Sequence, residues 1–175
     1  MKLFNRYFAG LLIFLFALPI LAVAQKEDSE PTNSSDMELK ACGPADKEAK
    51  YVADTDKKQH PTGTAEPDTA LIYVIRSTMF GNKIQTKLAV DGEWKGVNRG
   101  DNYFFFTVKP GEHYFCGRAE NRAVLVLNVE AGKTYYLGQR IHMGMWKART
   151  DLVAMNEADG QQELAKAHPS TWTVK

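Results

Sequence analysis

The sequence has few of the residues that catalysis and metal binding need. Between Asp36 and Ala167 there is a single serine, Ser77, and it ends an apolar run with no nucleophile-elbow motif around it. The chain has four histidines, none at ligand spacing, and His113 and Cys116 would face opposite sides of a strand. These absences argue against a serine hydrolase and against a metal centre, and we expect no cofactor.

The sequence also lacks an excess of charge of either sign. It contains 22 Lys and Arg residues against 21 Asp and Glu residues, a net charge of +1. Such a chain does not attract nucleic acid by bulk charge. After residue 25 no apolar run is long enough to cross a bilayer, so we expect the mature chain not to span the membrane.

The one long apolar run lies at the N-terminus. A basic start and the apolar segment Leu11–Leu21 precede the small residues 22–24. This order predicts a secretory signal peptide over residues 1–24, and hence a periplasmic or extracellular protein. Cleavage would remove two basic residues and no acidic one, leaving 20 against 21 and a net charge of −1. The alternative is an uncleaved anchor, because Tyr7–Val23 approaches the length of a membrane span.

Cysteine is equally scarce, with only Cys42 and Cys116 in the chain. Thiols of exported proteins are oxidised, so we predict a disulfide between them. It would close a loop of about 75 residues. The resulting loss of entropy in the unfolded chain would stabilise the folded protein by roughly 4.5 kcal/mol. The alternative, a redox pair, favours a Cys-x-x-Cys spacing at a helix start, and this sequence has neither.

Two further segments divide the chain. Residues 25–41 are polar and poor in apolar side chains, which predicts a flexible tether. Residues 42–175 form the predicted domain, in which the turn signals Asp91-Gly92 and Pro110-Gly111 separate short apolar runs, a pattern typical of antiparallel strands joined by tight reversals. We interpret residues 49–60 as an extended segment attached to the sheet through Cys42.

Seven apolar or alternating runs predict strands. They are residues 70–78, 84–90, 94–98, 103–108, 123–129, 134–143 and 151–155. The near-continuous apolar run of the first predicts a central strand. Asn156 can cap a short helix through Ala167, which Gly160 would weaken and Pro169 would follow. With no βαβ alternation, the pattern indicates an all-β fold, a single antiparallel β-sandwich with one short C-terminal helix.

Alternation over Tyr103–Val108 directs Phe104 and Phe106 towards the core and leaves Phe105 on the opposite face. That face is our candidate binding surface, formed by Tyr103, Phe105 and Tyr114, because exposed rings recognise sugars and partner chains. Further large rings in the chain are Tyr135, Trp146 and Trp172. The alternative is burial of these rings under residues 49–60.

Several motifs together resemble those of a bacterial family of exported proteins, domain of unknown function 2846. In chain order they are Cys42-Gly43-Pro44, Thr55–Pro61, Ala70–Ile75, Val90-Asp91-Gly92, Asn102–Phe106, Pro110–His113 and Ala131–Tyr136. The resemblance covers roughly Cys42 to Met155. It implies an immunoglobulin-like or PEGA-like β-sandwich and export, and it implies no activity, cofactor or catalytic residue.

We therefore expect a non-catalytic, exported β-sandwich module, a binding or structural protein of the bacterial cell envelope, whose partner is an envelope protein or a glycan. The alternative is an envelope hydrolase with a site built from the turn carboxylates Asp91, Asp101 and Glu112. These positions favour acidic residues for turn geometry alone. The same turn chemistry explains Arg99-Gly100-Asp101, the tripeptide that integrins bind.

Overall fold

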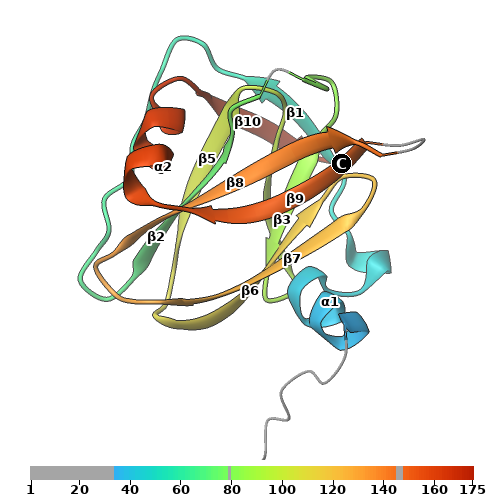
Figure 1. The fold of residues 1–175 in the computed structure, drawn as a ribbon, viewed down its shortest axis with the longest axis horizontal. Coiled ribbons are helices and arrows are strands. Elements are labelled where there is room, and N and C mark those ends of the chain that lie inside the picture. The colour runs from blue at the N-terminus through green and yellow to red at the C-terminus, as the bar shows by residue number, and fades with distance from the viewer. Residues whose placement is uncertain (1–33, 79, 145–147) are drawn as a thin grey trace, which may run out of the picture.

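The computed structural model describes residues 34–78, 80–144 and 148–175. The predicted signal peptide, residues 25–33 of the predicted tether and Trp146 lie outside the described residues. The described part is an all-β structure of two packed sheets, with one helix before the first strand and another before the last strand (Figure 1).

Six strands of the described chain form the larger sheet in the order β1-β10-β5-β2-β8-β9. In that order they span Tyr51–Thr55, His168–Val174, Asn102–Val108, Ala70–Arg76, Thr134–Met143 and Ala148–Met155. The smaller sheet has the order β4-β3-β6-β7. Its strands span Glu93–Asn98, Thr86–Val90, Gly111–Arg118 and Arg122–Val129.

The larger sheet is mixed, so the prediction of a purely antiparallel fold is wrong. β2 runs antiparallel to β5 but parallel to β8, and β10 runs parallel to β5. Parallel neighbours need a long crossover, and here the chain between β2 and β8 supplies one by passing through the smaller sheet. The sequence pattern reveals strands but not their partners, which is why it missed this crossover.

The two turn signals have different outcomes. Asp91 and Gly92 both have positive φ, 51° and 83°, and they close the β3–β4 hairpin as predicted. Pro110-Gly111 joins β5 of the larger sheet to β6 of the smaller one, so it is not a hairpin. A Pro-Gly or Asp-Gly pair predicts that the chain changes direction at that point. It does not predict which strand the next strand pairs with, because that depends on packing.

The core lies between the sheets. Every residue of β2 is buried, which confirms the prediction of a central strand. Fully or nearly fully buried side chains from both sheets meet there, among them Ile72, Val74, Leu88, Phe104, Phe115 and Leu137. Phe104 faces this core as the alternation predicts, and Phe106 packs at its margin.

The helix α1, Ser34–Cys42, covers the outer face of the smaller sheet, so the tether prediction is wrong for residues 34–41. Its last two residues, Ala41 and Cys42, are buried against Ala89, Tyr114 and Cys116. A short 3-10 helix, η1, follows at Ala45–Lys47. A composition poor in apolar residues suggested disorder, but two buried residues and a covalent anchor hold this helix on the sheet.

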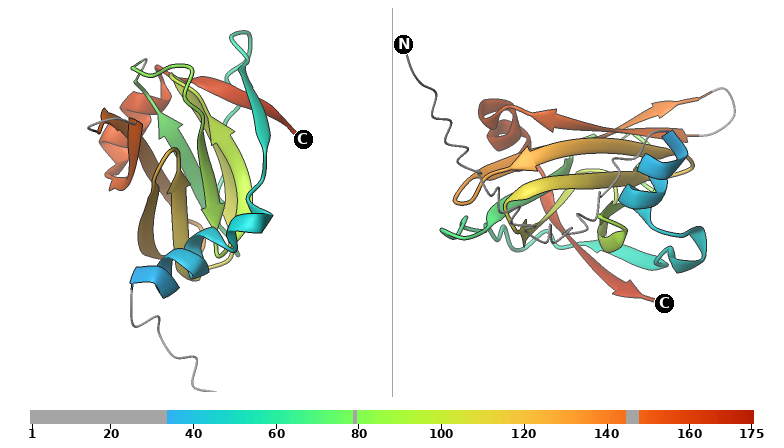
Figure 2. Two further views of the ribbon diagram at one scale, coloured as in Figure 1. Left: turned by 90° about the vertical axis from the view of Figure 1, so that its right-hand side faces the viewer. Right: turned by 90° about the horizontal axis from the view of Figure 1, so that it is seen from below.

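The helix α2, Glu157–Leu164, confirms the predicted short helix, although it ends three residues before Ala167, and it covers the outer face of the larger sheet (Figure 1). The Asn156 side chain caps it by accepting a hydrogen bond from the Asp159 amide at 2.9 Å. The chain then continues into β10, which the sequence pattern did not predict because Pro169 suggested only a helix end. Pro169 is tolerated because it stands at the start of β10, where the pairing with β5 is limited to His168 and Pro169. The rest of the strand, from Ser170 on, lies beside β1 (Figure 2).

Gly160 explains how closely α2 approaches the sheet. A Cβ atom at this position would lie 2.2 Å from Cγ of Tyr136. A Gly-to-Ala change in a helix ordinarily stabilises by up to about 1 kcal/mol. Here we expect Gly160→Ala to destabilise the fold by about 1 to 3 kcal/mol, because the helix must move off the Tyr136 ring. Chemical denaturation measures this, with the exposed Gln162→Ala as the control expected to change little.

Candidate functional site

The predicted aromatic binding surface is not a surface, and this prediction is wrong. Tyr103 is fully buried and Tyr114 is 4% exposed, while Phe105 is partly buried. Tyr103 and Phe105 belong to a cluster with Tyr73, Tyr136 and Leu164 of α2. Each ring lies within an apolar cluster of the fold, so none of the three is free to bind a ligand.

The covering segment also differs from the one expected. Residues 51–55 form β1 at the sheet edge, and of the predicted segment His60 lies on the rings, with 5.0 Å between its ring centroid and that of Tyr103. Residues 61–63 and α2 complete the cover. The Tyr103 hydroxyl donates to the Pro61 carbonyl at 2.7 Å, and the Gly63 amide donates to the Tyr73 hydroxyl at 2.8 Å. Burial, together with nearby Tyr73, raises the pKa of Tyr103 to about 12. These tyrosines hold a loop in place.

Tyr114 lies on the other sheet, under α1. The Nζ atom of Lys40 is 3.8 Å from the centre of its ring, and its hydroxyl donates to Glu112 at 2.7 Å. The Tyr114 amide donates to Asp91, whose carboxylate also lies 2.6 Å from Nδ1 of His113. Two of the three turn carboxylates therefore have structural partners around Tyr114.

His113 connects the Asp91-Gly92 and Pro110-Gly111 turns. Its Nε2 atom lies 2.7 Å from the Lys109 carbonyl, just before Pro110, while Nδ1 faces Asp91. In the part of the chain that the structure describes, no group of three or more His, Cys, Asp or Glu residues has the geometry to hold a metal ion.

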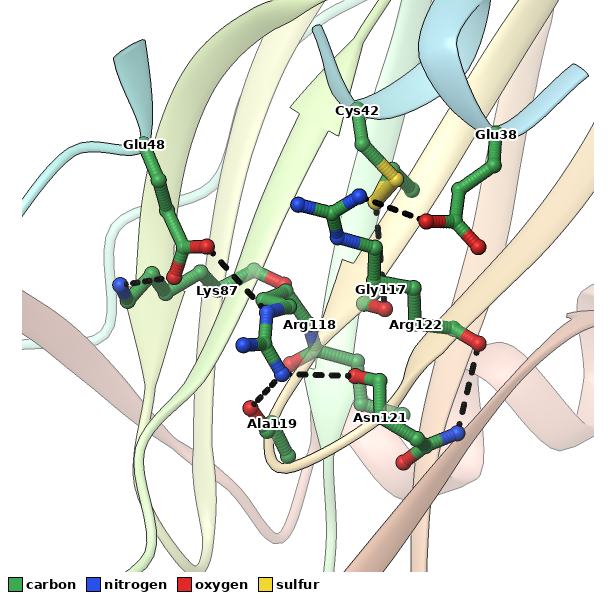
Figure 3. Close-up of a disulfide and its surroundings, with 11 residues drawn as sticks. Glu38, Cys42, Glu48, Lys87, Gly117, Arg118, Ala119, Asn121 and Arg122 are labelled. Atoms are coloured by element: carbon green, nitrogen blue, oxygen red, sulfur yellow. Dashed lines mark hydrogen bonds and ion pairs between the residues drawn. A yellow bond between two sulfur atoms is a disulfide. The ribbon is translucent and has the colours of Figure 1, made fainter. Parts of the chain in front are cut away.

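Cys42 and Cys116 form a disulfide, as predicted, and both residues are almost fully buried. Around it, Arg122 pairs with Glu38 of α1 at 2.6 Å, and Glu48 pairs with Lys87 at 2.6 Å and Arg118 at 3.2 Å (Figure 3). Burial alone raises the pKa of Glu48, but Lys87 and Arg118 together outweigh it and hold the pKa below its usual value. These ion pairs fix residues 38–48 on the smaller sheet.

Ser77 also has a structural partner. Its hydroxyl donates to Glu163 of α2 at 2.9 Å, and Arg140 contacts the same carboxylate through two nitrogens at 2.6 and 2.8 Å. Burial raises the pKa of Glu163, whereas Arg140 and Ser77 lower it more, so the net shift is downward. The network ties α2 to the ends of β2 and β8.

Arg76, at the end of β2, is a fully buried charge that no carboxylate pairs with among the described residues. Its guanidinium donates to the carbonyls of Phe80, Gly81 and Ile84 and to the Thr86 hydroxyl. Burial lowers its pKa to about 10. Since four acceptors occupy its two terminal nitrogens, Arg76 orders the loop after β2.

A polar pocket of about 310 Å³ opens at one end of the larger sheet. Four segments meet there: the end of β1, the loop at Asn82, the β4–β5 connection and the start of β10. The lining residues are all polar or glycine, and they are Asp54, Thr55, Lys57, Asn82, Arg99, Gly100, Asp101 and His168. The lining contains no Phe, Tyr or Trp, and its one ring is the imidazole of His168.

The floor of the pocket is rigid. Asn102 is fully buried, and its amide group bonds the Thr55 hydroxyl at 3.0 Å, the Arg99 amide at 3.2 Å and the His168 carbonyl at 3.3 Å. Asp101 has a positive φ of 62°, a conformation that aspartate tolerates better than most residues. The loop that carries Arg99, Gly100 and Asp101 is thus pinned to β1 and β10 and is not a free tip.

The charged groups of the pocket lack charged partners. Within the described residues no ion pair involves Asp54, Lys57, Arg99 or Asp101. Arg99 reaches only the carbonyls of Ala53 and Asn82, at 3.4 and 3.5 Å. In the cavity beside α1, by contrast, Glu38 and Arg122 neutralise each other.

Of the candidate site residues named from the sequence, Asp101 lines this pocket together with its neighbours Arg99 and Gly100, and Thr55 and Lys57 of the motif Thr55–Pro61 line it too. Asp54, Lys57 and His168 were missed because they are distant in the sequence and β10 was not predicted. The sequence signal that pointed to this pocket was the pair of charges on either side of Gly100. That signal does not indicate which strand ends lie next to it in the fold.

The fold and the site thus define a disulfide-closed, all-β protein of two packed sheets with a polar pocket at one end of its larger sheet. Residues 66–151 match the family model described as "Protein of unknown function (DUF2846)", which confirms the resemblance found from the motifs. The match runs from just before β2 into β9, so Cys42, β1, α2 and β10 lie outside it.

A protein of Haemophilus influenzae, described only as uncharacterized, is 26% identical over 96 residues. The alignment covers 54% of this chain and 57% of the relative, so it spans less than two thirds of that protein. No solved structure matches the chain. Neither described helix has the length and apolar character needed to cross a membrane.

Proposed function

We propose that this protein is a non-catalytic, exported module of the bacterial cell envelope, an immunoglobulin-like or PEGA-like β-sandwich that binds an envelope partner. The polar pocket carries the proposal, because it gathers charged side chains that have no charged partner among the described residues, on a backbone fixed by the hydrogen bonds of Asn102. By contrast, the charged residues Glu38, Glu48 and Glu163, in the segments that cover the two sheets, form ion pairs that hold those segments in place. The buried disulfide supports an oxidising compartment, periplasmic or extracellular.

Site-specific photo-crosslinking in the native bacterium tests this proposal. A photoreactive residue replaces the exposed Lys58, next to the lining residue Lys57, and in a control it replaces the exposed Asp68, which precedes the opposite end of β2. We expect an envelope-fraction adduct from position 58 that Arg99→Gln removes, and none from position 68. Equal labelling from both positions, or an adduct indifferent to Arg99, would contradict a binding role for the pocket.

A hydrolase is the second candidate, and one observation favours it: Asp54, Asp101 and His168 line the same pocket. The hydrolase site expected from the sequence, built from Asp91, Asp101 and Glu112, does not form. Asp91 and Glu112 bond to Tyr114 and do not line the pocket that holds Asp101. Turnover of envelope peptides or glycans that Asp101→Asn abolishes without loss of folding would establish the hydrolase. Under our proposal, parent and variant are equally without turnover.

A further inference from the structure

The charge pattern of the polar pocket indicates the kind of ligand it takes. Two fixed cations, Lys57 and Arg99, and two carboxylates, Asp54 and Asp101, line one cavity of about 310 Å³. Within the described residues no ion pair joins either of these cations to either of these carboxylates. A ligand that carries one charge of each sign would satisfy both sets at once, whereas a simple anion or cation would be repelled by one of them.

We infer that this pocket binds a small zwitterion, a free amino acid or a dipeptide, with its carboxylate towards Arg99 and its ammonium group towards Asp101. The inference rests on the proposed binding function and names its ligand class. Arg99 offers a planar set of donors that matches a carboxylate, and its present bonds to backbone carbonyls are long. Asp101 has no hydrogen-bonded side-chain partner within the described residues, so its oxygens remain available as acceptors.

The size and lining of the pocket exclude other ligand classes. Its volume lies at the lower end of the range for small-molecule sites, roughly 300 to 1,000 Å³. The lining holds no Phe, Tyr or Trp, and its one ring is the small imidazole of His168, so a sugar lacks the large aromatic face on which it usually stacks. A phosphate group would meet Asp54 and Asp101 as well as the cations, and its second negative charge would strengthen that repulsion.

The site is also preorganised. Asn102 holds Thr55, Arg99 and His168 together through its buried amide, and the Asp101 carbonyl accepts from the His168 amide at 2.9 Å. The Gly100 amide donates to the Asn82 carbonyl, and this hydrogen bond joins the loop at Asn82 to the other three segments that line the pocket. Because the backbone around the pocket is fixed, the ligand does not have to order it on binding.

The test is an NMR titration of the full mature chain, labelled with ¹⁵N, at low ionic strength. The probes are alanine and alanyl-alanine in both enantiomeric forms, with N-acetylalanine keeping only the carboxylate and alanine amide keeping only the ammonium group. We expect amide shifts at Gly100 and His168 and none at Gly132, which lies at the other end of the sheet. Each single-charge analogue should bind at least about tenfold more weakly, since it leaves one set of charges unpaired.

Two variants link binding to the proposed groups. Arg99→Gln and Asp101→Asn should each weaken binding at least about tenfold, and asparagine retains the positive φ of position 101. The matched controls are Arg149→Gln, on the opposite edge of the sheet, and Asp68→Asn, both exposed and both expected to bind as the parent does. Denaturation of each variant confirms that it is folded.

Equal binding of N-acetylalanine and alanine would make the pocket an anion site and overturn the inference. The absence of shifts at Gly100 and His168 with every probe would overturn it too. If the envelope adduct from position 58 persists in that case, the binding module stands and only the ligand class is wrong. If the adduct is also absent, the proposed function fails as well.

Discussion

Replacement of Cys116 by alanine should lower the free energy of unfolding by about 2 to 5 kcal/mol. The bond joins residues 74 positions apart, so reduction frees a long loop in the unfolded chain and raises its entropy. It also releases the end of α1, whose contacts with the smaller sheet include few apolar side chains. Urea denaturation of parent and variant, checked for equal slopes, measures the loss.

A second variant separates the bond from the packing of the thiols. Cys42→Ala also removes the disulfide, so the double variant should be little less stable than either single one. If the double variant instead lost the full sum of the two single-variant stability losses, packing of the side chains, and not the bond, would stabilise α1. A loss below about 1 kcal/mol in every variant would contradict a stabilising bond.

The Phe105→Ala variant should lose about 3 kcal/mol. This is the lower end of the range for a deleted core ring, because Phe105 stays partly exposed. Its ring packs against Tyr73 at 5.3 Å between centroids, and a Cβ atom on Gly63 would lie 2.9 Å from it. The residue therefore secures the loop at residues 61–63 on the outer face of the sheet, and denaturation measures its contribution.

Thr107→Ala is the control for Phe105. Thr107 is exposed on the same strand and the same face, so its replacement should change stability by no more than about 0.5 kcal/mol. If the Phe105→Ala protein had the same free energy of unfolding as the parent, the Phe105 ring would not stabilise the cluster around Tyr73. It would also restore Phe105 as a place to look for a ligand.

The sequence predicted what is local and missed what depends on distant neighbours. The Asp91-Gly92 hairpin, the Asn156 cap and the strand at Thr134–Met143 are confirmed, because turn geometry, capping and alternation act within a few residues. β10 was missed because Pro169 ends a helix more often than it starts a strand. Its partners, β1 and β5, are far away in the sequence.

The same limit explains the errors at the candidate site. Phe105 does lie opposite the core, but alternation says nothing about what covers that outer face, and residues 61–63 with α2 cover it. The pocket depends on β1, the Asn82 loop and β10 meeting around Asn102, which no spacing in the sequence indicates. Only its Asn82 and Arg99–Asp101 parts lie within residues 66–151, the range of the family match.

The most direct test of an exported, disulfide-closed module is the intact mass of the protein purified from its own bacterium after alkylation without reductant. We expect a chain that begins at Gln25 and carries no alkyl group, because the signal peptide is removed and Cys42 and Cys116 are bonded to each other. A chain that keeps residues 1–24, or one with two alkylated cysteines, would contradict this account.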